Sequence, residues 1–230
     1  LVDKAKNTII GRDFGFSSIK SYEDFSKNVP VFSYENFSDK IELARKGENN
    51  IFWPTKIKWF AKSSGTTNSK SKFIPVSDES LEDCHYAAGK DLLCMYLNNN
   101  SDSQLFTGKS LRLGGSKTPY EKNGTFYGDL SAILIDNMPF WAEFSSTPSN
   151  KTSLMNDWNY KIEAIINETI NENVTSLAGV PSWMLVLLNK IIERSDKKYI
   201  SEIWPNLEVY FHGGVSFKPY LNQYNNILNN

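Results

Sequence analysis

The stretch Lys62-Ser63-Ser64-Gly65-Thr66-Thr67-Asn68-Ser69-Lys70-Ser71-Lys72-Phe73-Ile74-Pro75 places small and hydroxyl residues and lysines between apolar flanks. Glycine lets backbone amides approach an anion, hydroxyls donate hydrogen bonds, and lysine adds a mobile positive charge. The preceding run, residues 57–61, predicts a strand. A strand that leads into such a loop is a common phosphate-binding arrangement in α/β proteins. The same composition also fits a plain turn.

The loop is not a Walker loop. Gly65 is its single glycine, and Lys72 is followed by Phe73 instead of Ser or Thr. The spacing G-x-x-x-x-G-K-[ST] is therefore absent.

The composition of the chain is that of an ordinary globular protein. It has 230 residues, 40% of them hydrophobic and 22% charged, with a net charge of −1. The charge pattern excludes the basic stripe of a nucleic-acid-binding protein. No apolar run reaches the roughly 18 residues that cross a bilayer, and we expect neither a signal peptide nor a membrane partner.

Cys84 and Cys94 are the two cysteines of the chain, and both fall in one predicted helix. Their Cα atoms would lie about 15 Å apart there, too far for a disulfide. We expect reduced packing residues in a cytoplasmic protein. Cys84 and His85 have no second ligand pair at suitable spacing, so we predict no metal site built from side chains.

Periodicity and capping signals predict the elements outside the loop. Ser21 and Ser33 each precede a short helical segment, and Ser77 begins a strong helix that ends near residue 98, in which Met95 and Tyr96 pack in the core. Short strands are predicted at residues 105–106 and 111–113, and Gly114-Gly115-Ser116-Lys117 fits a hairpin or surface turn.

In the second half of the chain, strands are predicted at residues 130–135, 174–178 and 207–211. Residues 137–141 should form a loop, and helices should span residues 154–170, begin at Gly179-Val180-Pro181, and begin again at residue 216. This alternation predicts a layered α/β sheet.

A second glycine site follows the last predicted strand, at His212-Gly213-Gly214-Val215. Ligands of open α/β sheets bind outside the carboxyl ends of the strands, and two glycines there would let a flat ring or a phosphate approach the backbone. A tight strand–helix turn explains the same residues. Histidine often serves as an acid or base, but we do not assign His212 a catalytic role.

The order of these two sites resembles that of the adenylate-forming enzymes, the acyl-CoA synthetase and luciferase superfamily. The wider sequence resembles a bacterial member of the auxin-responsive promoter family (Gretchen Hagen three) over essentially the whole chain. The motifs that carry the resemblance are Ser21-Tyr22-Glu23-Asp24-Phe25, Val29-Pro30-Val31, Trp53-Pro54, Lys62-Ser63-Ser64-Gly65-Thr66-Thr67, Lys72-Phe73-Ile74-Pro75, Ala178-Gly179-Val180-Pro181-Ser182-Trp183-Met184 and Phe211-His212-Gly213-Gly214-Val215.

The resemblance implies an ATP-dependent acyl acid amido synthetase that adenylates a carboxylic acid and then joins it to an amino acid. It assigns the ATP phosphates to Ser63, Ser64, Gly65, Thr66 and Thr67, with Lys72 as a weaker candidate. It assigns the adenosine to His212, Gly213, Gly214 and Val215, and the pocket for a hydrophobic or aromatic acid to Val180, Pro181, Trp183 and Met184. Mg²⁺ would bridge the phosphates, but no carboxylate ligand can be named. Catalytic residues stay unassigned.

The resemblance also implies that 230 residues are an incomplete large N-terminal domain. We expect layered mixed sheets with flanking helices, divided into a helical preamble (1–55), a phosphate-loop subregion (56–129) and an α/β subregion (130–230). A tyrosine- and acid-bearing strand and a C-terminal lid domain are expected beyond residue 230. A sheet that ends at its Gly-Gly strand would have an open edge. Two alternatives stay open: a ligase that uses coenzyme A, and a catalytically silent fragment that binds nucleotide weakly or not at all.

Overall fold

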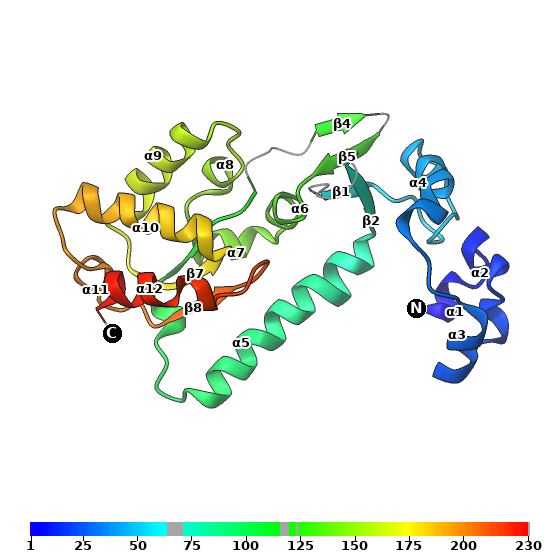
Figure 1. The fold of residues 1–230 in the computed structure, drawn as a ribbon, viewed down its shortest axis with the longest axis horizontal. Coiled ribbons are helices and arrows are strands. Elements are labelled where there is room, and N and C mark those ends of the chain that lie inside the picture. The colour runs from blue at the N-terminus through cyan, green and yellow to red at the C-terminus, as the bar shows by residue number, and fades with distance from the viewer. Residues whose placement is uncertain (64–70, 116–119, 123, 230) are drawn as a thin grey trace. The chain divides into compact units, whose positions relative to one another are not determined.

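The computed structural model describes residues 1–63, 71–115, 120–122 and 124–229 (Figure 1). The chain divides into two compact units. Unit 1 contains Leu1–Asp91 and Pro119–Ile133, and unit 2 contains Leu92–Thr118 and Leu134–Asn230. Each unit therefore combines two separate stretches of sequence.

The sheet of unit 1 mixes strand directions. Its order is β2-β1-β5-β4. Strand β1 runs antiparallel to β2 and parallel to β5, and β5 runs antiparallel to β4. The strands are β1 (Trp59–Ser63), β2 (Lys72–Val76), β4 (Tyr120–Lys122) and β5 (Thr125–Gly128).

Short capped helices precede this sheet in the sequence. Ser21 and Asp24 form a capping box at the start of α3, and Ser33 and Asn36 form another at η2, as the two serines predict. The helices of this part are α1 (Val2–Ala5), α2 (Ile9–Asp13), η1 (Phe16–Ser18), α3 (Tyr22–Asn28), η2 (Tyr34–Phe37) and α4 (Ser38–Arg45).

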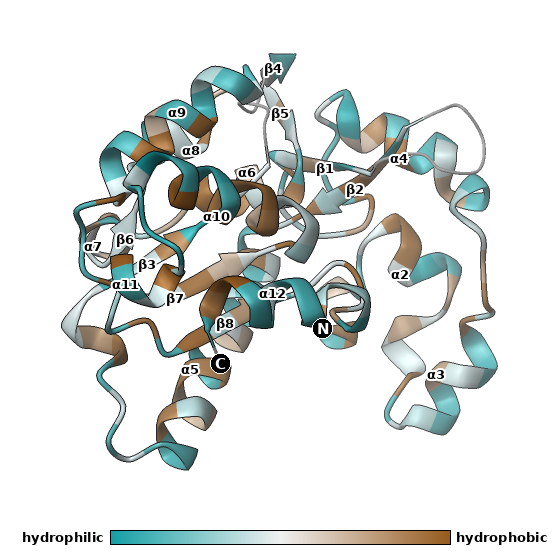
Figure 2. Cartoon of the chain, turned by 60° about the vertical axis from the view of Figure 1, so that its left-hand side comes forward, coloured by the Kyte–Doolittle hydropathy of each residue, from teal (hydrophilic) through white to brown (hydrophobic). Residues whose placement is uncertain are grey.

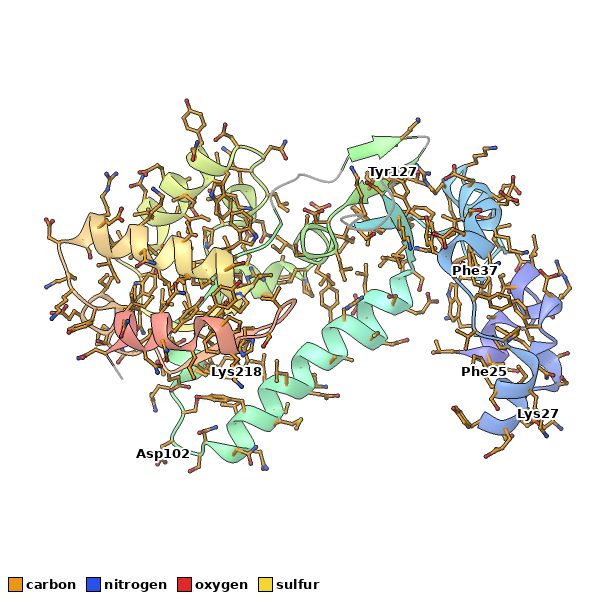
Figure 3. All side chains as sticks on the ribbon, in the orientation of Figure 1. Phe25, Lys27, Phe37, Asp102, Tyr127 and Lys218 are labelled. Atoms are coloured by element: carbon orange, nitrogen blue, oxygen red, sulfur yellow. The ribbon has the colours of Figure 1, made fainter. Side chains whose placement is uncertain are left out.

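The core of unit 1 depends on aromatic rings. Phe60 is fully buried and stacks on Tyr127 with 5.6 Å between the ring centroids. Phe73 meets Tyr127 edge-on at 5.5 Å. Aliphatic residues of α4 and the following loop complete this cluster, namely Ile41, Ala44, Ile51 and Ile57. Figure 3 labels Tyr127 at β5 and Phe37 beside α4.

The sheet of unit 2 is parallel throughout, in the order β6-β3-β7-β8. Its strands are β3 (Lys109–Arg112), β6 (Ser146–Thr147), β7 (Val174–Gly179) and β8 (Val209–His212). The predicted strands at 111–113, 174–178 and 207–211 are confirmed with small shifts of their ends. Two sheets with flanking helices confirm the predicted α/β class.

Helices α9, α10 and α12 supply the apolar side chains that pack on this sheet. Leu187, Leu188 and Ile191 of α10 are fully buried, as is Ile165 of α9. Brown stretches in Figure 2 mark β7 and α10 as apolar. The helices of this part are η4 (Leu105–Thr107), α7 (Phe140–Phe144), α8 (Asn150–Ser153), α9 (Trp158–Thr169), α10 (Pro181–Ser195), α11 (Ile200–Ile203), η5 (Lys218–Tyr220) and α12 (Leu221–Leu228).

The strand predicted at residues 130–135 is wrong, because this run forms helix α6 (Leu130–Asp136). The amide of Ile133 donates to the carbonyl of Asp129, which closes the first helical turn. A run of six residues, five of them apolar, does not reveal its own period, and tertiary packing of Ala132, Ile133 and Ile135 selects the helix.

Three other boundaries also differ from prediction. Residues 105–106 begin the 3₁₀ helix η4 instead of a strand, and α7 begins inside the predicted loop at 137–141. Helix α9 begins at Trp158 instead of near residue 154, because the Asp157 side chain accepts hydrogen bonds from the amides of Asn159 and Tyr160.

The helix predicted after Ser77 is present, as a π-helical turn η3 (Ser80–Tyr86) followed by α5 (Ala87–Asn99). The predicted core role of Met95 is wrong, because 65% of its surface is exposed. Tyr96 is half-buried and meets Phe211 edge-on. Cys84 and Cys94 are free, as expected, but both are exposed and do not pack in a core. In the part of the chain that the structure describes, no helix has the length and apolarity to span a membrane.

Candidate functional site

The predicted phosphate loop connects two antiparallel strands of unit 1. Ser63 ends β1, Lys72 begins β2, and the two are register partners. Ser64, Gly65, Thr66 and Thr67 lie outside the described residues. Ser63 and Lys72 therefore mark the two ends of the loop.

Lys72 already has a neighbour of opposite charge. Its Nζ lies 3.6 Å from the Glu35 carboxylate and 5.3 Å from the centroid of the Tyr34 ring. The pKa of Glu35 is lowered, first by a hydrogen bond from its own backbone amide, then by the Ser33 hydroxyl and by Lys72. An ion pair as exposed as this one contributes little, so Lys72 can exchange Glu35 for another anion at small cost.

The backbone beside Lys72 is fixed by a tyrosine. The Tyr34 hydroxyl accepts a hydrogen bond from the Phe73 amide at 2.8 Å and donates one to the Phe73 carbonyl at 3.4 Å. Arg45 lies over the Phe73 ring, with its guanidinium carbon 3.8 Å from the centroid. Sequence reasoning missed Arg45, and no motif around it would have revealed this contact.

In unit 2 the parallel strands bring several predicted residues to one edge. Gly179 is the register partner of His212, and the Leu113 amide donates to the Ala178 carbonyl at 2.9 Å. The turns that follow β3, β7 and β8 therefore meet at the carboxyl edge of the sheet.

The backbone turns pack closely at this edge, which two glycines permit. Gly214 has a φ of +82°, and a Cβ built on it would lie 3.3 Å from Cγ2 of Val180. A Cβ on Gly179 would lie 3.1 Å from the Leu113 carbonyl oxygen. The structure thus brings the predicted residues Val180 and Gly214 together. Around Gly213 a built Cβ meets no described atom within 4 Å, so its backbone is open to a ligand.

Two tyrosine hydroxyls hold the turn between β7 and α10. Tyr210 donates to the Gly179 carbonyl at 3.0 Å, and Tyr224 donates to the Pro181 carbonyl at 2.8 Å. Burial is the first cause that raises the pKa of each tyrosine above its ordinary value. Both hydroxyls are therefore protonated donors at neutral pH.

His212 is exposed, and its ring stacks on Phe217 with a centroid distance of 4.6 Å and an interplanar angle of 25°. Val215 is also exposed. An aromatic stack at the end of β8 offers a flat surface to a planar ligand.

The four residues assigned to an acyl pocket have different environments. Pro181 and Met184 are buried, Met184 within the hydrophobic cluster of unit 2. Val180 is half-buried. Trp183 is exposed and lies edge-on to Trp158 at 4.7 Å. Of the four, Val180 and Trp183 present side-chain surface.

Sequence reasoning also missed a buried lysine at this edge. Lys161 of α9 is fully buried, and its Nζ donates to the carbonyls of Gly114 at 3.2 Å and Gly115 at 2.8 Å. Its position four residues before Ile165 places Lys161 on the buried face of α9, but the sequence does not identify the carbonyls that it binds. Lys161 fixes the turn that follows β3.

A shallow concavity of unit 2 lies instead beside the starts of β3 and β7. It is lined by Lys109, Glu168 and Glu172, among others, and by none of the predicted site residues. Lys109 pairs with Glu172 at 2.6 Å, and Glu168 accepts from the Ser149 amide at 2.7 Å. These charges already have partners. The described residues also contain no cluster of three or more His, Cys, Asp or Glu side chains placed to hold a metal ion.

Comparison with known proteins places this arrangement among solved folds. The structure matches that of GH3.15 acyl acid amido synthetase with a TM-score of 0.74 and 16% sequence identity, over 99% of this chain and 50% of that one. It matches AtGH3.15 acyl acid amido synthetase in complex with 2,4-DB with a TM-score of 0.67 and 23% identity, over 84% of this chain and 34% of that one. Identities this low show a shared fold.

The chain spans about half the length of the first of these proteins. No curated protein matches the sequence. The model of the GH3 family N-terminal domain, however, matches residues 1–230. The chain therefore belongs to the GH3 family and carries its N-terminal domain.

Proposed function

We propose that this chain supplies the nucleotide- and acyl-binding part of an ATP-dependent acyl acid amido synthetase. The observation that carries the proposal is the family match over residues 1–230. The shared fold with solved acyl acid amido synthetases supports it.

The reaction has two steps. The carboxylate oxygen of the acid attacks the α-phosphorus of ATP, and pyrophosphate leaves to give an acyl-adenylate. The amine of an amino acid then attacks the acyl carbon, the amide bond forms, and AMP leaves with the bonding electron pair while the amine loses a proton. Both steps develop negative charge on oxygen, which fixed amide, hydroxyl and cationic donors stabilise.

In this proposal, one set of residues binds the phosphates of ATP and another set binds its adenosine. Residues 63–67 donate to the phosphates, and Lys72 exchanges its exposed Glu35 partner for a phosphate oxygen. The open backbone of Gly213, the turn at Gly214 and the exposed His212 ring receive the adenosine, with Val215 beside them. Mg²⁺ keeps several waters when it binds nucleotide phosphates, so a single protein carboxylate is enough.

The acyl acid is proposed to be a small hydrophobic or aromatic carboxylate. The apolar start of α10, with Val180, Pro181, Trp183 and Met184, supports that choice. The similar structure that contains 2,4-DB supports a small ligand of this size. The partners are then one acid and one amino acid. The free cysteines suit a reducing compartment, so we place the reaction in the cytoplasm.

Exchange of labelled pyrophosphate into ATP tests the first step. The protein is incubated with ATP, Mg²⁺ and a panel of aliphatic and aromatic acids, and a parallel arm uses any longer natural form of it. We expect acid-dependent exchange that the double substitution Ser64→Ala, Thr66→Ala reduces by about 100-fold, since each lost donor to a charged oxygen is worth roughly tenfold. Ser17→Ala, at an exposed serine of unit 1, is the matched control and should exchange normally.

Two further measurements identify the acceptor of the acyl group and test whether the chain is catalytically silent. Adding amino acids or coenzyme A to the exchange mixture and identifying the product distinguishes an amido synthetase from an acyl-CoA ligase. Calorimetry with ATP and Mg²⁺ reports binding without chemistry. No exchange in any form of the protein, with no binding of ATP, would refute the proposal.

A further inference from the structure

Arg112 ends β3, the strand between β6 and β7 in the parallel sheet. Its register partner in β7 is Ala178, which in turn pairs with Phe211 of β8. Register partners in parallel strands point to the same face of a sheet. The preceding set, Leu111, Leu177 and Tyr210, belongs to the hydrophobic cluster under α9, α10 and α12. Arg112, Ala178 and Phe211 therefore lie on the opposite face.

Arg112 is half-buried, and its guanidinium has few hydrogen-bond partners among the described residues. Its single hydrogen bond to another described residue goes from Nη1 to the sulfur of Met138. Among the described residues, no carboxylate lies within ion-pair distance of Arg112. Burial lowers the pKa of this arginine, and the attraction of Glu143 opposes that shift. Arginine nevertheless stays protonated in proteins, so a positive charge is fixed here.

A half-buried cation without a bound anion is costly, and a thioether is a weak acceptor for it. The guanidinium has five donors in a planar fork that fits a carboxylate with two parallel hydrogen bonds. Most of these donors face no acceptor on the described residues. A guanidinium with free donors is suited to bind an oxyanion.

The neighbours of Arg112 favour an apolar monoanion over a polyphosphate. Ala178 has a small side chain and lies between Arg112 and Phe211 in the register, and Phe211 meets the Tyr96 ring edge-on at 5.8 Å. Arg112 and Phe211 are two strand spacings apart, about 10 Å, which suits a carboxylate attached to an aromatic or short aliphatic body. The negative charge of Glu143 nearby disfavours a ligand of several negative charges.

We propose that Arg112 binds the carboxylate of the acyl acid and that the apolar body of the acid lies over Ala178 toward Phe211. The acid then lies on the sheet face opposite the buried side of α10, and this placement replaces the one at the start of α10. This assignment rests on the proposed function for its role in the reaction. It makes Arg112 a specificity-determining residue that selects an ionised acid over a neutral analogue of the same shape.

The test compares phenylacetate with phenylacetamide, which differ in charge at one end. Binding to the protein is followed by NMR titration without ATP, so the readout needs no turnover. We expect the carboxylate to bind about tenfold or more tightly than the amide, from charge-assisted hydrogen bonds. Arg112→Met should reduce that preference to near unity, and Arg112→Lys should keep part of it.

Arg194→Met is the matched control, because it removes an exposed arginine of α10 that pairs with Glu163 elsewhere in unit 2. It should keep the full preference. If Arg112→Met does not fold, the Nε–H resonance of Arg112 in the unsubstituted protein gives a second measurement, assigned by its loss in Arg112→Lys. It should shift with phenylacetate and stay in place with phenylacetamide.

Equal binding of the two probes, or an unchanged preference in Arg112→Met, would overturn the proposal. Pyrophosphate that binds more tightly than phenylacetate, and that depends on Arg112, would overturn it in favour of a nucleotide phosphate. Failure of the ligase assignment gives a different pattern, in which phenylacetate binds through Arg112 but no acid supports pyrophosphate exchange. Exchange that persists at unchanged KM for the acid in Arg112→Met would refute the role of Arg112 alone.

Discussion

Unit 1 and unit 2 each contain a four-stranded sheet, but the two sheets position their candidate ligand groups differently. In unit 1 one antiparallel hairpin connection, between β1 and β2, carries the predicted phosphate loop. In unit 2 the turns after three parallel strands meet at one edge. The first arrangement is local in sequence, whereas the second assembles residues near positions 114, 179 and 213.

The cores of the two units also differ in the kind of side chain that fills them. Unit 1 packs rings and an arginine around β1, β2 and β5, and unit 2 packs aliphatic side chains of α9 and α10 on its sheet. A site assembled from three turns depends on that aliphatic core, while a hairpin loop depends mainly on its own two strands. Damage to the core of unit 2 should therefore disturb more of the candidate site.

Core truncation should give the largest effects. Leu187→Ala in α10 removes a fully buried side chain and should lower the free energy of unfolding by about 2–5 kcal/mol. Ile41→Ala in α4 of unit 1 is the matched substitution at a comparably buried aliphatic residue. Denaturant unfolding measures both losses.

Hydrogen exchange decides whether the two units respond separately. Leu187→Ala should accelerate exchange at the amides of β7 and β8, and Ile41→Ala at those of β1 and β5. If either substitution opens both sheets equally, the units form one cooperative block, and the contrast between a local and an assembled site loses its energetic basis.

The elements that sequence predicted well carry local signals. Pro181 at the first position of α10, after the β-branched and apolar run of β7, marks both a strand end and a helix start. The capping serines Ser21 and Ser33 mark two helix starts in the same way. Residues 130–135 lack such a signal, since their five apolar residues fit a buried strand as well as a buried helix.

The residues of the candidate site could be predicted from sequence only where they belong to one continuous motif. Gly214 sits in a glycine motif after a strand, and its positive φ fits that motif. Lys161 and Arg112 act through partners that sequence does not identify. Lys161 binds carbonyls 46 and 47 residues away, and Arg112 contacts Met138 26 residues away. Contacts of this kind follow from tertiary packing, not from a local pattern.

Hydroxyls that fix backbone near each candidate site should give the next largest effects. Tyr224→Phe removes the donor to the Pro181 carbonyl, and a buried acceptor left without a partner costs about 1–3 kcal/mol. Tyr34→Phe removes two contacts to Phe73 in unit 1 at a part-buried position, where water can replace the hydroxyl. We expect the smaller loss there, again from denaturant unfolding. A larger loss for Tyr34→Phe would reverse the ranking of the two units.

The pH dependence of stability should differ between the units in direction. The pKa of Glu79 in unit 1 is lowered, first by a hydrogen bond from Lys4, so its contribution is present above the ordinary pKa of 4.5 and is lost as pH falls. The pKa values of Tyr210 and Tyr224 in unit 2 are raised above 10.0, first by burial. The unfolded chain then loses those protons first, so this contribution is complete below pH 10 and is lost as pH rises.

Denaturant unfolding at several pH values checks these signs. Tyr224→Phe should flatten the alkaline loss and leave the acid loss unchanged, whereas Tyr160→Phe, at an exposed tyrosine of unit 2, should change neither. An alkaline loss that persists undiminished in Tyr224→Phe would assign it to groups other than this hydroxyl.

The smallest effects should come from the two adjacent glycines after β8, and they separate backbone geometry from ligand access. Gly214→Ala should cost about 1–2 kcal/mol, because an L-residue disfavours its φ of +82° and the new methyl meets Val180. Gly213→Ala should stay within about 0.5 kcal/mol, since no described atom lies within 4 Å of its built Cβ. Yet the methyl on residue 213 would occupy the open space that we assign to the adenosine. Calorimetry should therefore find weakened ATP binding in Gly213→Ala at unchanged stability. Unchanged ATP affinity in that variant would mean that the assembled edge of unit 2 holds its turns for packing and that the nucleotide binds elsewhere.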